Sequence, residues 1–349
     1  MQSFLIYGAN GYTGELIARE AARRGWQPVL AGRNGAQVAA LAQELQLPHQ
    51  VFALDDAARL DEALRPVAAV LHCAGPFAHT AAPMAEACLR AGTHYLDITG
   101  EISVFEDLAR RNAAARAARV LLLPGVGFDV VPSDCLARHL ANRLPTATHL
   151  TLAFHGLGAG GASHGTQATM LLNAGSGGAV RRAGHIVPVP AAWKTRRFDF
   201  GSAQRTAVTI PWGDVSTAFH SAGIPNIEVY MALPKSARRM LRLSRYLGPL
   251  LAARPVQALL KRRIAPGGPT AEQRQRGRMA LYGEASDDAG QRVAARLIGP
   301  EGYAFTVLTA LHITEKVLRG EAPVGFQTPA KAFGAGLVLE VEGVELVDL

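Results

Sequence analysis

The chain has little cysteine and no recognisable ligand pattern for a metal. Its three cysteines, Cys73, Cys88 and Cys135, stand at unrelated spacings. An odd number so arranged predicts free thiols in a reducing compartment rather than a disulfide framework. Neither an H-E-x-x-H motif nor a Cys/His grid occurs, so we predict no metal site. No Ser-His-Asp or Cys-His arrangement stands out either, and the sequence therefore gives no sign of covalent catalysis.

Long apolar runs are also absent. Although 49% of the 349 residues are hydrophobic, no eighteen of them follow one another without a charge, so no membrane-spanning segment is predicted. The chain begins directly on an apolar strand-like segment, and we therefore expect no signal peptide and a cytoplasmic location. The length and the 18% of charged residues predict a globular protein of two domains.

Acidic residues are missing between Glu228 and Glu272, where nine basic residues stand. Apolar residues interleave with arginines there, and Pro249 and Pro255 divide the segment, so we predict short amphipathic helices over residues 232–263. We favour packing of their apolar face on the second domain or on a dimer partner. Peripheral docking on an anionic membrane is the alternative. Aromatic residues for base stacking are scarce, and specific nucleic-acid binding is not predicted.

Charge of either sign is missing from Leu144 to Val180. We predict that this stretch forms a neutral wall of the substrate pocket. A substrate with several carboxylates would need arginine clamps, and the arginines that could supply them stand beyond this wall: Arg181, Arg182, Arg196, Arg197 and Arg205. The pattern favours a weakly charged substrate over one with several carboxylates.

The chain begins with a glycine-rich segment. Residues 4–14 read FLIYGANGYTG, in which a short apolar run predicts a buried strand and the following helical pattern ends at Gly25. Glycines let the backbone approach a dinucleotide pyrophosphate, and a helix N-terminus supplies amide donors. The spacing is G-x-x-G-x-x-G, and a structural turn is the alternative. The residues predicted to bind the cofactor here are Gly8, Asn10, Gly11, Tyr12, Thr13 and Gly14.

The next strand indicates which dinucleotide is bound. It ends at Gly32, and no acidic residue stands between Glu20 and Glu44. An acid at this position would bind the ribose 2′-hydroxyl of NAD, whereas arginine accommodates a 2′-phosphate. Arg33 therefore predicts NADP, with NAD less favoured. Further along the chain, the predicted contacts are Asn34, Asp55 beside the adenine, with helix capping as the alternative for Asp55, and Ala74, Gly75 and Pro76 near the nicotinamide ribose.

Strands alternate with helices up to about residue 130, and the pattern then changes. The first part predicts an α/β Rossmann-type domain with a doubly wound parallel sheet, over residues 1–130. Residues 149–155 alternate as a half-buried antiparallel strand would, and residues 278–299 read as a hairpin. We therefore predict a second α+β domain with a mixed sheet, for substrate binding and oligomerisation, over residues 131–302. Residues 303–349 are predicted to form a helix and a tail that pack back on the core.

Several motifs occur in an order that resembles a known family. They are Tyr7–Gly14, Leu30–Asn34, Ala74–Phe77, Tyr95–Glu101 and Gly127–Asp129, with Gly302-Tyr303 and Thr328–Ala330 near the C-terminus. Together they resemble the saccharopine dehydrogenase-like NAD(P)-dependent oxidoreductases, in particular the branch that includes trans-acting enoyl reductases. The resemblance implies a Rossmann cofactor domain, a substrate domain, a nicotinamide cofactor and a homodimer. It does not fix the reaction, because the family is functionally mixed. Taken with the neutral wall, the resemblance implies a weakly charged, lipid-like enoyl or keto substrate, and an amino-acid derivative with an imine or secondary amine stays open.

Hydride transfer is chemistry of the cofactor, so the protein has to orient the substrate and handle a proton. The candidates for this proton are Asp129, Glu101 and His164. Each has a structural alternative: Asp129 as a brace for its loop, Glu101 as a helix cap, and His164 as a packing residue. His164 stands in Ser163-His164-Gly165-Thr166, where members of the family often have Ser-Gly-Gly-Thr. A scaffold or sensor that binds NADP without turnover also stays open.

Overall fold

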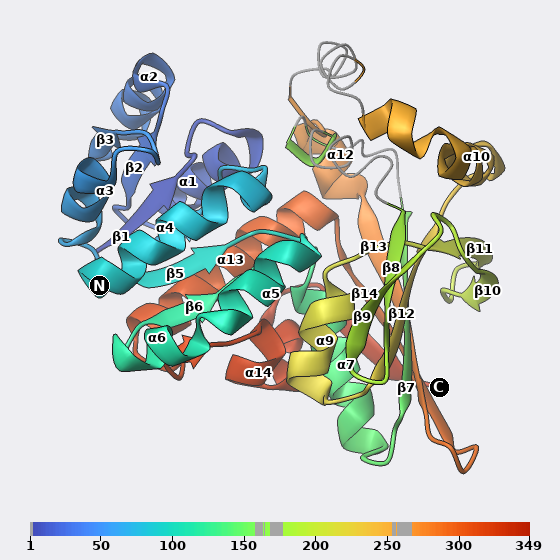
Figure 1. Ribbon diagram of the computed structural model, residues 1–349. Coiled ribbons are helices and arrows are strands. Elements are labelled where there is room, and N and C mark those ends of the chain that lie inside the picture. Colours follow the sequence, from blue (N-terminus) through green and yellow to red (C-terminus); the bar gives the residue numbers. More distant parts are fainter. Residues whose placement is uncertain (1–2, 158–162, 164, 168–176, 253–255, 257–266) are drawn as a thin grey trace. The chain divides into compact units, whose positions relative to one another are not determined.

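The computed structural model describes residues 3–349, except 158–162, 164, 168–176, 253–255 and 257–266 (Figure 1). The chain forms two compact units. The first contains residues 1–131 and 303–332, and the second contains residues 132–302 and 333–349. The segment 303–349, predicted as one C-terminal element, therefore contributes to both units.

Seven parallel strands form the sheet of the first unit, in the order β15-β6-β5-β4-β1-β2-β3. The order reverses between β1 and β4, which is the switch point of a doubly wound sheet. The strands are β1 (Phe4–Tyr7), β2 (Val29–Gly32), β3 (His49–Val51), β4 (Ala69–His72), β5 (His94–Asp97), β6 (Leu121–Leu123) and β15 (Gly325–Phe326). The predicted Rossmann-type sheet is confirmed.

Helices of the first unit lie beside this sheet (Figure 1). They are α1 (Tyr12–Arg23), α2 (Gly35–Leu45), α3 (Ala57–Leu64), α4 (Phe77–Ala91), α5 (Ile102–Arg110), α6 (Asn112–Ala117), α13 (Gly302–Leu318) and α14 (Pro329–Phe333). β1 and β4 read FLIY and AVLH, and every residue in them is buried. Strands covered on both faces need such continuous apolar runs, which is why the sequence pattern identified them.

The second unit is built on a nine-stranded mixed sheet. Its main path is β10-β11-β12-β7-β13-β14-β16, and β8 and β9 pair beside β12. The strands are β7 (His149–Leu157), β8 (Gly178–Arg182), β9 (His185–Val189), β10 (Thr195–Asp199), β11 (Gln204–Thr209), β12 (Asn226–Ala232), β13 (Arg278–Ser286), β14 (Arg292–Pro300) and β16 (Glu345–Asp348). The predicted mixed sheet and the hairpin of β13 with β14 are confirmed.

One strand prediction in this unit is wrong in part. β7 pairs antiparallel with β13 but parallel with β12, so it is a central strand of the sheet and not simply an antiparallel one. Alternation shows that side chains face two sides of a sheet, but it carries no information about the direction of the neighbouring strands. The helical elements of this unit are α7 (Val131–Arg143), α9 (Asp214–Ala222), α10 (Lys235–Ala252), α12 (Ala271–Arg276) and the 3₁₀ helix η1 (Ala335–Glu340).

Candidate functional site

The turn after β1 holds three glycines that have different structural roles. Gly8 has φ +81°, and a Cβ there would lie 2.8 Å from both the Cβ and the backbone nitrogen of Ala74. A Cβ on Gly14 would lie 2.2 Å from the carbonyl oxygen of Gly8, so only glycine lets α1 approach the turn this closely. Gly8 and Gly14 are therefore required by the protein's own backbone.

Gly11 is different, because a Cβ there would come close to a single backbone atom and its φ and ψ angles suit any residue. It has φ −80° and ψ 158°, which any residue adopts, and it is exposed at the N-cap of α1 without a side-chain cap. A Cβ there would meet only the Gly8 carbonyl oxygen, at 3.2 Å. A backbone kept bare at a helix N-terminus fits a bound pyrophosphate. The residues of this turn thus fit a dinucleotide.

The residues predicted to contact the adenosine half of the cofactor follow β2 and β3. Arg33 is exposed there. Asn34 caps α2 by accepting from the Gln37 amide at 3.2 Å, and Asn10 donates to the Gln37 side chain at 2.8 Å. Asp55, after β3, is exposed. Asn10 and Asn34 thus both contact Gln37, and Arg33 is exposed where the sequence predicts a contact with a 2′-phosphate.

The loop after β4 is held by the start of α4 and by Glu101. The Glu101 carboxylate accepts from the amides of Phe77 and Ala78, at 2.8 and 3.0 Å. Phe77 and Ala78 are the first two residues of α4, so the carboxylate lies at the positive end of the helix dipole. Gly75 is exposed, and a Cβ on it would make only ordinary contacts with Phe77. Glu101 is therefore placed as a helix cap for the neighbouring α4.

Among the predicted site residues, Asp129 has the carboxyl group with the largest shift in pKa. Its Oδ2 lies so close to Gly100 that a Cβ there would be 2.9 Å from it. Burial and, secondarily, the nearby Glu101 carboxylate raise the pKa of Asp129 from 3.8 to about 7. A carboxyl with a pKa near neutrality can carry a proton and release it, as a general acid must. Such perturbed groups cluster at functional sites.

The loop that carries Asp129 is fixed from three directions. Asp97, at the end of β5, accepts from the amides of Thr99 and Gly125 at 2.9 and 2.8 Å. On α13, Thr306 accepts from the Phe128 amide at 3.0 Å, and Thr309 donates to the Val126 carbonyl at 2.9 Å. Sequence reasoning missed these positioning residues. Asp97 lay in a quoted motif, but no local signal connects Thr306 with a loop nearly 180 residues earlier.

Beneath the loops lies an aromatic layer around His72. This side chain ends β4, is completely buried and stands beside Tyr7, Phe77 and Tyr95. Among the described residues, neither of its ring nitrogens has a hydrogen-bond partner. Burial lowers the pKa of His72 from 6.5 to about 3, so it is neutral at physiological pH. We assign it to packing.

The described structure brings most of the predicted residues to one edge of the parallel sheet. The turn after β1, Arg33 after β2, Ala74–Pro76 after β4 and Asp129 beyond β6 all follow carboxyl ends of strands. Tyr12 packs its ring edge-on to Tyr303 of α13, with centroids 5.1 Å apart. His164 lies outside the described residues. Within the described part of the chain, no group of three His, Cys, Asp or Glu side chains is arranged to hold a metal ion.

A parallel sheet with this switch point and this glycine turn defines a dinucleotide-binding domain of the Rossmann type. In this domain, residues 4–123 match the family model described as "Saccharopine dehydrogenase NADP binding domain". This match and the relatives below confirm the predicted resemblance to saccharopine dehydrogenase-like proteins.

Two curated relatives are named trans-acting enoyl reductase. The protein from Mycobacterium ulcerans is 33% identical over 149 residues, which are 40% of this chain and 35% of that protein. The protein from Mycobacterium tuberculosis H37Rv is 32% identical over 149 residues, with the same shares. The aligned region thus spans about a third of these relatives' length.

One solved structure covers the whole chain. The saccharopine dehydrogenase (L-Glu forming) of Saccharomyces cerevisiae matches with a TM-score of 0.68 over 100% of both chains, at 12% identity. At this identity the match concerns the fold alone, and it agrees with the parallel sheet and the mixed sheet described above.

Proposed function

We propose that this protein is an NADPH-dependent reductase of a weakly charged, lipid-like enoyl or keto substrate. The observation that carries the substrate class is the state of the arginines that a polycarboxylate substrate would need. Arg181 is buried, donates to the carbonyls of Val215 and Gly184 at 2.7 and 2.6 Å, and stacks on Phe219. Arg196 donates to both carboxylate oxygens of Glu284, at 3.0 and 2.9 Å. These two guanidinium groups are therefore already engaged by the protein.

The three other candidate clamps differ from one another in their surroundings. Arg182 stacks over Trp193, with 4.6 Å to the ring centroid, and Arg197 and Arg205 are exposed on β10 and β11. The names of the curated relatives, trans-acting enoyl reductases, support an enoyl substrate. A saccharopine-type imine or secondary amine is the competing substrate class, and binding without turnover is the third possibility.

In this proposal each residue of the candidate site has a separate role in cofactor binding or proton transfer. The bare backbone of Gly11 and the N-terminus of α1 hold the pyrophosphate, and Arg33 holds the 2′-phosphate. When bound, the nicotinamide cofactor supplies the hydride. Asp129 gives its proton to the substrate carbon or oxygen that becomes negative as the hydride arrives, and regains a proton from solvent. Burial and, secondarily, the negative charge of Glu101 favour the protonated form of Asp129 near neutral pH.

A substrate panel tests the reaction. NADPH carrying deuterium at nicotinamide C4 is incubated with enoyl thioesters, keto thioesters and an imine-forming pair of amino acid and keto acid, and products are analysed by mass spectrometry. We expect deuterium in the reduced enoyl or keto product. Transfer only to the imine would establish the saccharopine-type reaction, and tight NADPH binding without any transfer would establish a scaffold. Gly11→Val serves as the control that lacks a cofactor site.

Cofactor preference is tested separately, with Arg33→Asp. The change removes one charge-assisted contact and adds a repulsion, each of which is worth about a tenfold or larger change in affinity. We expect NADPH to bind more tightly than NADH in the unmodified protein and the order to reverse in Arg33→Asp. Fluorescence titration of the two cofactors measures this. Equal affinities in the unmodified protein would refute the NADP assignment.

A further inference from the structure

Helix α10 (Lys235–Ala252) presents an apolar surface to solvent. Three side chains at helical spacing on it, Met240, Leu243 and Tyr246, are 71%, 61% and 83% exposed. They are the three most exposed large hydrophobic side chains of the described chain. In a helix of a soluble domain such residues ordinarily face the core. This surface, Met240, Leu243 and Tyr246, is called the α10 apolar face below.

The arginines of α10 partly face the protein instead. Arg238 donates to the Leu233 carbonyl at 2.7 Å, and Arg242 to the Thr195 hydroxyl at 2.6 Å. Arg245 donates to the carbonyls of Ala191 and Ala192, at 2.5 and 2.6 Å. Arg242 and Arg245 thus attach the helix to its own unit, whereas Met240, Leu243 and Tyr246 are exposed.

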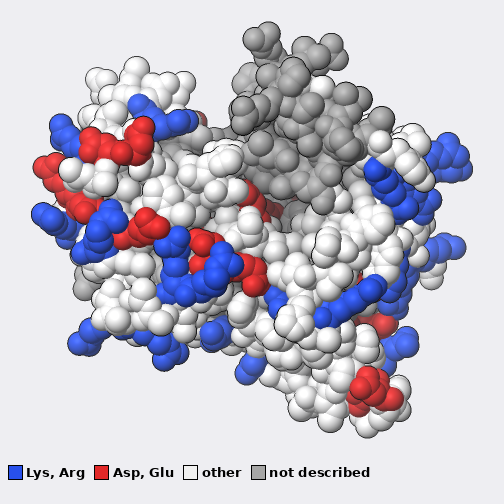
Figure 2. Space-filling model, viewed as in Figure 1, with Lys and Arg blue, Asp and Glu red and all other residues white. Residues whose placement is uncertain are grey.

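The positive charge of α10 is not neutralised. Among the described residues, no ion pair joins Lys235, Arg238, Arg239, Arg242 or Arg245 to an acidic side chain. Lys235 and Arg239 are exposed beside the α10 apolar face. Figure 2 shows Lys and Arg gathered where Figure 1 places α10, β10 and β11, without acidic side chains around α10.

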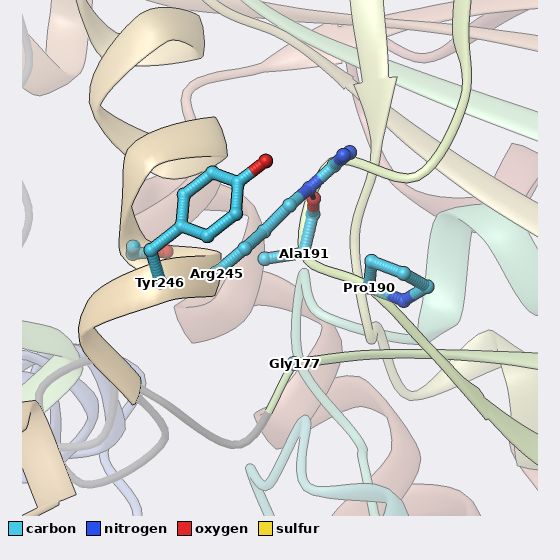
Figure 3. Close-up of a pocket in the computed structure, with 6 residues that line it drawn as sticks. Gly177, Pro190, Ala191, Arg245 and Tyr246 are labelled. Carbon is cyan, nitrogen blue, oxygen red and sulfur yellow. Dashed lines mark hydrogen bonds between the residues drawn. The ribbon is translucent and has the colours of Figure 1, made fainter. Parts of the chain in front are cut away.

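A surface hollow adjoins this face. It has a volume of about 470 Å³ and is lined by Gly177, Pro190, Ala191, Ser244, Arg245 and Tyr246. Figure 3 shows the side chains of Arg245 and Tyr246 next to each other on α10, beside Ala191 and Pro190. Among the described residues, the Arg245 guanidinium donates to the carbonyls of Ala191 and Ala192. These acceptors are neutral, so the positive charge of Arg245 adds to the field of this surface.

We propose that the α10 apolar face docks on an anionic lipid bilayer. Met240, Leu243 and Tyr246 would enter the boundary between head groups and acyl chains, while Lys235 and Arg239 contact the anionic head groups. Charge decides between this occupant and a second copy of the chain. Two copies joined through α10 would bring like charges together, whereas an anionic surface complements them. The inference does not depend on which substrate is reduced.

A flotation assay with the full chain tests the proposal. Vesicles of phosphatidylcholine alone are compared with vesicles that also contain phosphatidylglycerol, at low and high salt. We expect recovery with the anionic vesicles at low salt and loss at high salt. Each basic residue near such a surface contributes about fivefold in binding. Lys235→Glu with Arg239→Glu should therefore lower the partition coefficient by about 25-fold or more.

Two further variants make the result specific. Met240→Ser, Leu243→Ser and Tyr246→Ser together should abolish flotation without changing the net charge. Arg65→Glu with Arg119→Glu changes the net charge as much as the α10 pair does, at exposed positions of the first unit, and should float as the unmodified protein does. Circular dichroism checks that each variant is folded.

Two outcomes would overturn the proposal. One is a protein that stays in the soluble fraction with anionic vesicles at low salt. The other is a dimer in light scattering that the three serine substitutions convert to a monomer, because the α10 apolar face would then be an interface between copies.

Discussion

Asp129 offers a quantitative test of the site that requires no substrate. We consider Asp129→Asn, which keeps the shape of the side chain and removes the carboxyl whose pKa rises from 3.8 to about 7 on folding. A raised pKa means that the folded protein resists ionisation of this group. The resulting loss in the free energy of unfolding is absent below pH 3.8, grows as the pH rises towards 7 and is fully present above pH 7. A shift of about three units corresponds to a free energy of the order of 4 kcal/mol at most.

The assay is urea unfolding of the apo protein at several pH values between 5 and 9, for both proteins. We expect Asp129→Asn to gain stability over the unmodified protein as the pH rises, with a plateau above pH 7. Asp55→Asn is the matched control, because Asp55 is an exposed aspartate of the same unit. It should show no such trend.

The same substitution links the pKa to catalysis. If Asp129 is the proton donor, kcat of the proposed reductase should fall as the pH rises through about 7, and Asp129→Asn should lose about 10²–10⁴-fold in kcat. A stability difference between the two proteins that does not change with pH would refute the raised pKa. A variant with full activity would show that the proton comes from another group.

The remaining predictions concern glycines and a histidine. Gly14→Ala places a methyl group 2.2 Å from the Gly8 carbonyl oxygen and should lower the free energy of unfolding by about 1–3 kcal/mol. Gly11→Val should keep the circular dichroism spectrum but abolish NADPH binding in a titration, and unchanged binding would contradict the cofactor site. Burial lowers the pKa of His72 from 6.5 to about 3. The unfolded chain therefore binds a proton that the folded protein does not, and the free energy of unfolding decreases as the pH falls from 6.5 to 3. His72→Phe should therefore lose less stability than the unmodified protein between pH 6.5 and 3 in urea unfolding, and parallel curves would exclude the buried neutral histidine.

Other predictions from the sequence stay open. The cytoplasmic location, the homodimer and the exact domain boundaries remain expectations, as do the individual site residues. No helix in the described part of the chain has the length and apolar character of a membrane span.

The sequence by itself determined the cofactor unit. Phe4–Tyr7 and Val67–Cys73 are continuous apolar runs, and Gly8, Gly11 and Gly14 stand between a strand and a helix. Such signals are local, because burial on both faces and the turn after a strand constrain the residues next to each other in the chain. Arg33 could be placed for the same reason, since it directly follows the second strand.

Only the tertiary structure decided what the polar residues do. It assigned Glu101 to the first amides of α4, Thr306 and Thr309 to the loop before Asp129, and Arg196 to Glu284. It also left Met240, Leu243 and Tyr246 of α10 exposed on the single chain. Each of these outcomes depends on a partner far away in the chain. A periodic pattern shows that a helix has an apolar face, but the packing of the whole unit decides which way that face points.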